Sequence, residues 1–139
     1  MPTRKINKII VRASTEFLGE VRDFVAHHAG LSGFDSEEVE DIRLAVDEAI
    51  TNVIKHAYQH DSSKLITVQQ GVDNSEFWVR ITDSGRSFNL EGYVEPDIEE
   101  RIRLKKKGGV GVYLIRRLMD NVEYKKVNSR NEIKMTKKL

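Results

Sequence analysis

The chain has 139 residues, with 23 Lys and Arg against 22 Asp and Glu, and a formal charge of +1 at pH 7. That balance argues against a broad basic face for nucleic acid, and the absence of cysteine excludes disulfides, thiolate metal sites and cysteine nucleophiles. Apolar residues (39%) and charged residues (32%) are typical of one globular domain spanning 1–139. We find neither a signal-peptide core nor an apolar run near the ~20 residues of a membrane helix, so we expect a cytoplasmic protein.

The first predicted elements are a strand and a helix. Residues 5–13 are rich in Ile and Val, which indicates a strand. Ser14 or Thr15 can then cap a helix whose apolar residues recur at helical spacing. Gly30 stands where a glycine commonly ends a helix, so we expect this helix to stop there.

The second predicted helix is long and amphipathic. Asp35 followed by Glu38 forms a capping-box pattern, and Phe34 and Val39 are spaced as a hydrophobic staple. Apolar residues then recur at 3.6-residue spacing for about six turns, as far as Ala57. This pattern predicts a continuous helix that lies against the core.

A predicted hairpin and an irregular segment follow. Alternating apolar side chains indicate strands over 64–72 and 75–83, and Asp73-Asn74 has the composition of the turn between them. The next segment, about 84–110, lacks steady periodicity. Unstructured connections of that length are uncommon in compact domains and often act as lids, so we expect a lid here.

A third helix and a second hairpin complete the predicted elements. The helix begins at Gly111, and the last two strands lie at 122–127 and 131–139 on either side of a polar turn. The order strand, two helices, two strands, lid, helix, two strands predicts an α/β sandwich (α+β). We expect a mostly antiparallel mixed sheet with three helices on one face.

Three polar residues of the second helix share one stripe. Glu48, Asn52 and Lys55 are spaced i, i+4 and i+7, with Asp47 and His56 at the border. A carboxylate, an amide oxygen and an ammonium in this arrangement can serve a proton, a metal ion and a phosphate. The alternative is a solvated helix face.

The segment Asp83-Ser84-Gly85 follows an apolar strand. A carboxylate at a strand end can accept hydrogen bonds from an exocyclic amine, and a glycine lets a ligand approach the backbone. An ordinary turn is the alternative, because this composition is common in turns.

Glycines precede the third helix in the segment Gly108-Gly109-Val110-Gly111, directly after Lys105–Lys107. Backbone N–H groups at a helix N-terminus suit phosphate, whereas the alternative is a flexible linker with a solvated basic run. The spacing is not that of a P-loop, and the glycines do not follow a strand as a Rossmann turn requires. The four histidines form no consistent metal-ligand pattern.

The order and spacing of these features resemble the GHKL nucleotide-binding fold of gyrase, heat-shock chaperone and histidine-kinase ATPases. More closely, the sequence resembles the bacterial anti-sigma-factor serine/threonine protein kinases. The matching segments are LAVDEAITNVIKHAY (44–58), ITDSGRSFN (81–89) and GGVGVYLIRRLMDNVEY (108–124). The resemblance implies a Bergerat-type ATP-binding fold.

The resemblance also implies roles for individual residues. Glu48 matches the family's general base, Asn52 the residue that holds Mg²⁺, and Asp83 the carboxylate that binds the adenine amino group. The other implied nucleotide-binding positions are Lys55, Gly85, Lys107, Gly108, Gly109, Gly111 and Val112. Between the last two strands the family commonly has Gly-Thr, whose hydroxyl supports the adenine pocket, where this sequence has Ser129-Arg130.

The activity implied by the resemblance is phosphorylation of a serine on a small antagonist protein of the anti-sigma factor, with ATP and Mg²⁺ as cofactors. A sigma factor is an implied alternative partner, and a homodimer the implied assembly. The competing interpretation is a module that sequesters its partner in a nucleotide-dependent way without kinase activity. Glu48 favours the enzyme, because sequestration needs no base.

Overall fold

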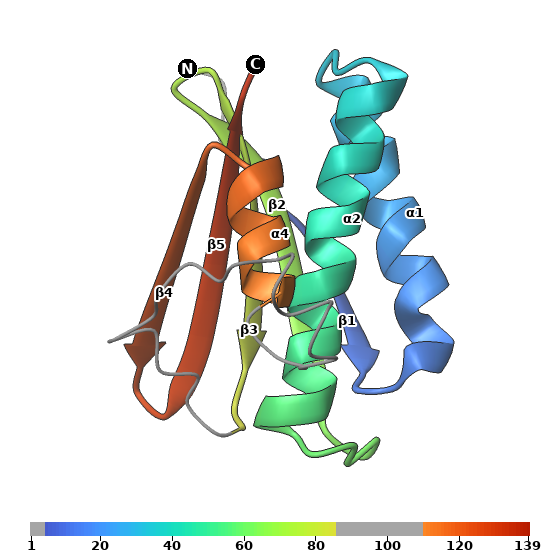
Figure 1. The fold of residues 1–139 in the computed structure, drawn as a ribbon, viewed down its shortest axis with the longest axis vertical. Coiled ribbons are helices and arrows are strands. Elements are labelled where there is room, and N and C mark those ends of the chain that lie inside the picture. The colour runs from blue at the N-terminus through green and yellow to red at the C-terminus, as the bar shows by residue number, and fades with distance from the viewer. Residues whose placement is uncertain (1–4, 86–109) are drawn as a thin grey trace, which may run out of the picture.

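The computed structural model describes residues 5–85 and 110–139, which form a sheet covered by helices (Figure 1). The strands are β1 (Asn7–Arg12), β2 (Leu65–Asp73), β3 (Glu76–Asp83), β4 (Asn121–Val127) and β5 (Arg130–Lys138). The helices are α1 (Leu18–Leu31), α2 (Ser36–Asn52) and α4 (Val110–Leu118). A 3₁₀ turn, η1 (Thr15–Phe17), precedes α1, and a π-helical turn, η2 (Val53–Ala57), continues α2.

The strands form one sheet in the order β1-β2-β3-β5-β4, and every described ladder is antiparallel. Figure 1 shows the three helices on one face of this sheet, with α2 between α1 and α4. The predicted α/β sandwich is therefore confirmed, although the described ladders contain no parallel pair. Within residues 5–85 and 110–139, no helix is long and apolar enough to cross a bilayer.

The core lies between the helices and the inner face of the sheet. Alternation along β2 and β3 places Ile66, Val68, Phe77, Val79 and Ile81 on this face, all with no exposed surface. The helices close over them with buried aliphatic side chains. Full burial of such a side chain contributes about 1.5–3 kcal/mol, so each side chain of this layer stabilises the fold.

Helix α1 ends at Leu31, one residue after the predicted stop, and the glycine that terminates it is Gly33, three residues after Gly30. Gly30 is still helical, and Gly33 takes the left-handed conformation, with φ of 102°. Gly33 N donates to Gly30 O at 3.1 Å, and Phe34 N donates to Ala29 O at 3.3 Å. These are the paired bonds of a Schellman motif, which needs a glycine at the position of Gly33 and not at that of Gly30.

Helix α2 begins as predicted but does not continue regularly to Ala57. Both bonds of the capping box are present: Glu38 N donates to Asp35 Oδ1 at 2.8 Å, and Asp35 N donates to Glu38 Oε1 at 3.4 Å. After Asn52 the helix widens into η2, where Tyr58 N donates to Val53 O at 2.9 Å. The longer turn returns Tyr58 to the buried side, above Val53.

Both hairpins turn at an Asn-Ser pair. Asn74 and Ser75 have φ of 51° and 63°, and Asn128 and Ser129 have φ of 49° and 68°. Two consecutive residues with positive φ are the signature of the type I′ turn, which matches the twist of the flanking strands. The first turn lies one residue later than predicted, because Asp73 still pairs with Glu76.

Candidate functional site

The candidate site lies at one end of the sandwich. In Figure 1, β3 and the helix formed by α2 and η2 finish at the lower end, and α4 begins on the side that faces this end. Asp83 is the last residue of β3, while Glu48 and Asn52 lie on the final turns of α2. The fold therefore brings segments that are far apart in the sequence to the same region.

Asp83 is a buried carboxylate, with 7% of its surface exposed. Its Oδ1 accepts hydrogen bonds from Gly85 N and Asn131 Nδ2, both at 2.9 Å. Burial raises the pKa of Asp83, while the bonds from Asn131 and Gly85 oppose that rise. Because both bonds use Oδ1, the described contacts leave Oδ2 as an acceptor for another donor.

Asn131 belongs to the candidate site, although no sequence pattern predicts it. It pairs with Asp83 across the ladder between β3 and β5, and its amide nitrogen also donates to Gly85 O at 3.0 Å. Ser129 and Arg130, which stand where the family commonly has Gly-Thr, are both exposed. The contact with Asp83 thus comes from one residue beyond Ser129-Arg130, and only the register of β5 reveals it.

Tyr58 fixes the residue that follows Asp83. Its hydroxyl donates to Leu65 O at 2.7 Å and accepts from Ser84 N at 2.8 Å, so it links the start of β2 to the end of β3. Tyr58 is buried, and nothing in the helical periodicity marks it as a site residue. The π turn η2 positions it for this contact.

Gly85 is required by close packing. A Cβ atom at this position would lie 2.3 Å from Ala57 O and 2.8 Å from the Tyr58 ring. The predicted reason for a glycine was the approach of a ligand, but the group that approaches it in the structure is the backbone of η2. The Asp-Ser-Gly segment is therefore held directly against the end of the long helix.

Glu48 and Asn52 are half-buried on α2, and in the described part of the chain no hydrogen bond occupies either side chain. Neighbouring Asp47 differs, because Arg22 Nε donates to both of its carboxylate oxygens, at 2.7 and 2.8 Å. Lys55 is exposed and lies inside η2. The α-helical spacing that places Lys55 on the stripe of Glu48 and Asn52 therefore ends at Asn52.

Lys107, Gly108, Gly109 and nearly all of the predicted lid lie outside the described residues. Gly111 and Val112 belong to the first turn of α4, which begins at Val110, one residue earlier than predicted. The predicted glycine-to-helix junction is therefore described only on its helical side.

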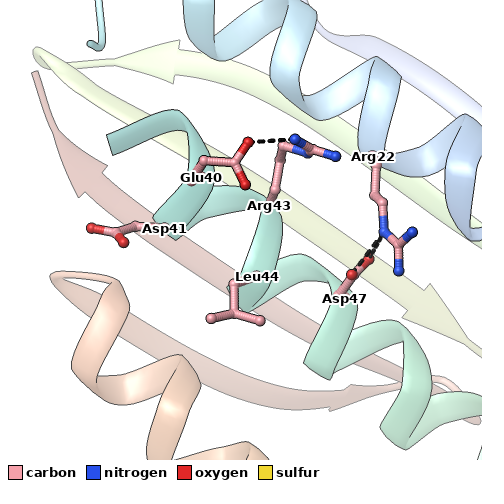
Figure 2. A pocket seen from close by; sticks show the side chains of 6 residues that line it. All are labelled: Arg22, Glu40, Asp41, Arg43, Leu44 and Asp47. Atoms are coloured by element: carbon pink, nitrogen blue, oxygen red, sulfur yellow. Dashed lines mark hydrogen bonds and ion pairs between the residues drawn. The ribbon is translucent and has the colours of Figure 1, made fainter. Parts of the chain in front are cut away.

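A shallow pocket of about 300 Å³ lies elsewhere, on the outer face of α1 and α2 (Figure 2). Its lining consists of Arg22 from α1 and five residues of α2, Glu40, Asp41, Arg43, Leu44 and Asp47. Arg22 pairs with Asp47, and Arg43 pairs with Glu40, so most of its charges are already neutralised. None of the predicted site residues lines this pocket.

Tyr124 of β4 contributes to the electrostatic surroundings of Asp83. Burial raises the pKa of Tyr124 to about 12; the charge of Arg116 lowers it, and that of Asp83 raises it further. The phenol is therefore neutral at physiological pH. Among residues 5–85 and 110–139, no cluster of three His, Cys, Asp or Glu side chains forms a metal site.

The arrangement is an α/β sandwich with a candidate ligand site at the end of its central strand, β3. The family model of the histidine kinase-like ATPase domain matches residues 11–137. Serine-protein kinase RsbW of Halalkalibacterium halodurans is 37% identical over 122 residues, which cover 85% of this chain and 74% of that protein. RsbW of Oceanobacillus iheyensis is also 37% identical, over 81% of this chain and 74% of the relative.

Two solved structures share the fold. A Mycobacterium tuberculosis protein with RsbU and RsbW domains has a TM-score of 0.69 and 18% identity, over 99% of this chain and 33% of that one. The histidine kinase AdeS of Acinetobacter baumannii has a TM-score of 0.51 and 14% identity, over 96% of this chain and 68% of that one.

These matches assign the class and then the family. The class is that of the histidine kinase-like ATPase domains, which binds ATP. Within it, the chain belongs to the RsbW family of serine-protein kinases. The family and fold predicted from the sequence are confirmed, and the predicted enzyme class agrees with the names of these relatives.

Proposed function

We propose that the chain is an ATP-dependent serine-protein kinase whose base-binding residue is Asp83. The observation that carries the proposal is the buried Asp83 carboxylate, held through Oδ1 at the end of β3, where Oδ2 can accept from the adenine amino group. An acceptor of this kind, fixed by neighbouring donors, suits recognition of an exocyclic amine.

The polar residues of α2 suit the phosphate end of the nucleotide. Asn52 offers an amide oxygen, and Mg²⁺ commonly binds through one or two protein oxygens together with phosphates, so a cage of several carboxylates is not needed. We assign Mg²⁺ to Asn52. When bound, the ion would neutralise charge on the phosphates. Lys55, Lys107, Gly108, Gly109, Gly111 and Val112 are the further proposed nucleotide contacts.

Glu48 is the proposed general base. It lies one helical turn before Asn52 on the same face of α2, about 5–6 Å along the helix. Its carboxylate would accept the proton of the attacking serine hydroxyl. Asp47 is less suited to this role, because its oxygens are engaged by Arg22.

The proposed phosphoacceptor is a serine of a small anti-sigma-factor antagonist, and a sigma factor is the proposed alternative partner. We place this activity in the cytoplasm. The alternative function, sequestration without phosphorylation, is not favoured, because the chain keeps a half-buried carboxylate at Glu48 that no described hydrogen bond occupies.

The test is phosphorylation by the Glu48→Gln variant. The protein is incubated with Mg-ATP and the small antagonist proteins of its own genome, and phosphoserine is measured. A general base contributes about 10²–10⁴-fold in rate, so Glu48→Gln should bind ATP normally but phosphorylate at least about 10²-fold more slowly.

The matched control is Glu37→Gln, which changes an exposed glutamate on the same helix and should leave the rate unchanged. Phosphotransfer at the wild-type rate in Glu48→Gln would show that Glu48 is not the base. A wild type that binds its partner but forms no phosphoserine would support the sequestering module instead.

A homodimer is the proposed assembly. β1 forms one edge of the sheet, and Ile10 on this strand and Leu65 on β2 are 52% and 55% exposed. An uncovered edge with exposed apolar side chains favours pairing with a second copy.

A further inference from the structure

Asn131 donates to two oxygen atoms of the candidate site. Its Nδ2 lies 2.9 Å from Asp83 Oδ1 and 3.0 Å from Gly85 O. Carboxylate and carbonyl oxygens only accept, so this face of the amide must carry the N–H groups. Asn131 therefore connects β5 to both ends of the Asp-Ser-Gly segment.

These bonds restrict how Asp83 can present its carboxylate. Oδ1 accepts from both Asn131 and Gly85 N, and Ser84 N is held by Tyr58. Rotation of the carboxylate would break both bonds to Oδ1. In the described contacts, Oδ2 is consequently the oxygen available to a ligand.

We propose that Asn131 is the positioning residue that makes the base site select adenine over guanine. This inference rests on the proposed function, in which Asp83 binds the base. At the same ring position adenine carries an amino donor and guanine a carbonyl acceptor. A fixed, ionised carboxylate accepts from the amino group and repels the carbonyl, whereas a protonated carboxyl group can donate to that carbonyl.

The surroundings of Asp83 show why this support matters. Burial raises the pKa of Asp83. Two hydrogen bonds lower it, and the bond from Asn131 has a larger effect than the bond from Gly85 N. Among the described residues, the titratable or charged side chains around this carboxyl group are Tyr58, which directly follows η2 and binds Ser84 N, and Tyr124 on β4, whose pKa is also influenced by Arg116 of α4. Loss of Asn131 should therefore raise the pKa of Asp83 and permit the donor form.

The experiment compares binding of ADP and GDP by calorimetry between pH 5 and 8. The wild type should prefer ADP. In Asn131→Leu, which keeps a similar volume without donors, the preference for ADP should fall at least about tenfold, and the acid limb of ADP binding should move to higher pH. Asn131→Thr restores one donor, so it should recover part of the preference for ADP and part of the shift of the acid limb. The matched control is Asn121→Leu, which changes an exposed asparagine on β4 and should alter neither.

Carbon-13 NMR titration of the Asp83 carboxyl group without nucleotide gives a readout independent of binding. Its midpoint should rise in Asn131→Leu and return toward the wild-type value in Asn131→Thr. If Asn131→Leu does not fold, Asn131→Thr is compared with the wild type alone. Its Asp83 titration midpoint should be measurably higher than that of the wild type, and its preference for ADP should be measurably weaker.

The outcomes separate this inference from the proposed function. A wild type that binds neither nucleotide contradicts the proposed function, and the inference falls with it. A wild type that prefers ADP, together with Asn131 variants that keep the same preference and the same Asp83 midpoint, overturns the inference alone.

Discussion

Burial raises the pKa of Asp83, so the ionised carboxylate at the end of β3 destabilises the fold. Two hydrogen bonds to Oδ1 offset part of that cost. At the scale of single residues, the candidate site therefore contains an ionised carboxylate that lowers the stability of the folded state. Strain or desolvation retained in this way is common where a side chain serves a ligand.

The Asp83→Asn variant should separate stability from binding. The folded-state pKa of Asp83 is raised, so its favourable contribution is present below the unfolded pKa and is lost as pH rises through the folded value. Asp83→Asn removes this loss, so its stability relative to wild type should increase as pH rises through that range. Urea unfolding at pH 4 and pH 7 measures the difference.

The same variant should lose adenine nucleotide, because an amide can present a donor to the adenine amino group. The expected cost is about 1–3 kcal/mol in binding free energy, measured by calorimetry. Asp23→Asn, at an exposed position on α1, is the control and should change neither property. Equal ATP affinity in wild type and Asp83→Asn would contradict the assignment of Asp83.

At the scale of elements, local hydrogen bonds decide where helices and hairpins begin and end. The capping box starts α2, the Schellman motif ends α1, and each hairpin closes through two residues with positive φ. The π turn η2 serves the site rather than the helix, because it brings Tyr58 to Ser84 and the Ala57 backbone to Gly85. Such turns are frequent at functional sites.

The hairpin turns offer a stability test. Ser75 and Ser129 are the second of the two central residues in their type I′ turns, where glycine adopts positive φ without a Cβ penalty. Ser75→Gly and Ser129→Gly should each stabilise the fold by up to about 1 kcal/mol, measured by urea denaturation. Ser62→Gly is the control and should give no gain, because Ser62 is exposed and is not among the residues with positive φ. No gain in either turn variant would contradict this account.

At the scale of the whole molecule, the open edge of the sheet should govern assembly. We expect sedimentation at tens of micromolar protein to give twice the 16.0 kDa mass of one chain. Ile10→Lys should shift the protein toward the monomer by placing a charge on β1. Leu31→Lys changes an even more exposed apolar residue at the end of α1 and should leave the dimer intact. A 16 kDa wild-type species would rule the dimer out.

Global stability should also depend on His28, which connects α1 to the sheet. Its Nδ1 lies 3.4 Å from Asn7 Nδ2, and burial, followed by the charges of His27 and Lys5, lowers its pKa. A lowered folded pKa means that the unfolded chain binds the proton more readily, so stability should fall as pH drops below 6.5 through the folded value.

The check is urea unfolding of wild type and His28→Gln at pH 5 and pH 8. The variant lacks the titrating imidazole and should show a smaller loss of stability at pH 5. Because His28 is partly exposed, we expect a modest difference. The same loss in both proteins would assign the acid sensitivity to other groups.

The sequence by itself determined the order of the elements, the start of α2 and which elements carry Glu48, Asn52 and Asp83. Each of these depends on residues a few positions apart, so periodicity and capping chemistry are sufficient to predict them. The family resemblance then attached roles to the same positions. It could not show which residues surround Asp83.

Only the tertiary structure decided the supporting contacts of the site. Asn131 meets Asp83 across 48 residues of sequence, through the ladder of β3 and β5, and no local pattern encodes that register. The π turn and the packing of Gly85 on Ala57 likewise depend on how the end of the long helix meets the sheet. Long-range pairing is set by burial and register over the whole fold, which is why these contacts become visible only once the chain is folded.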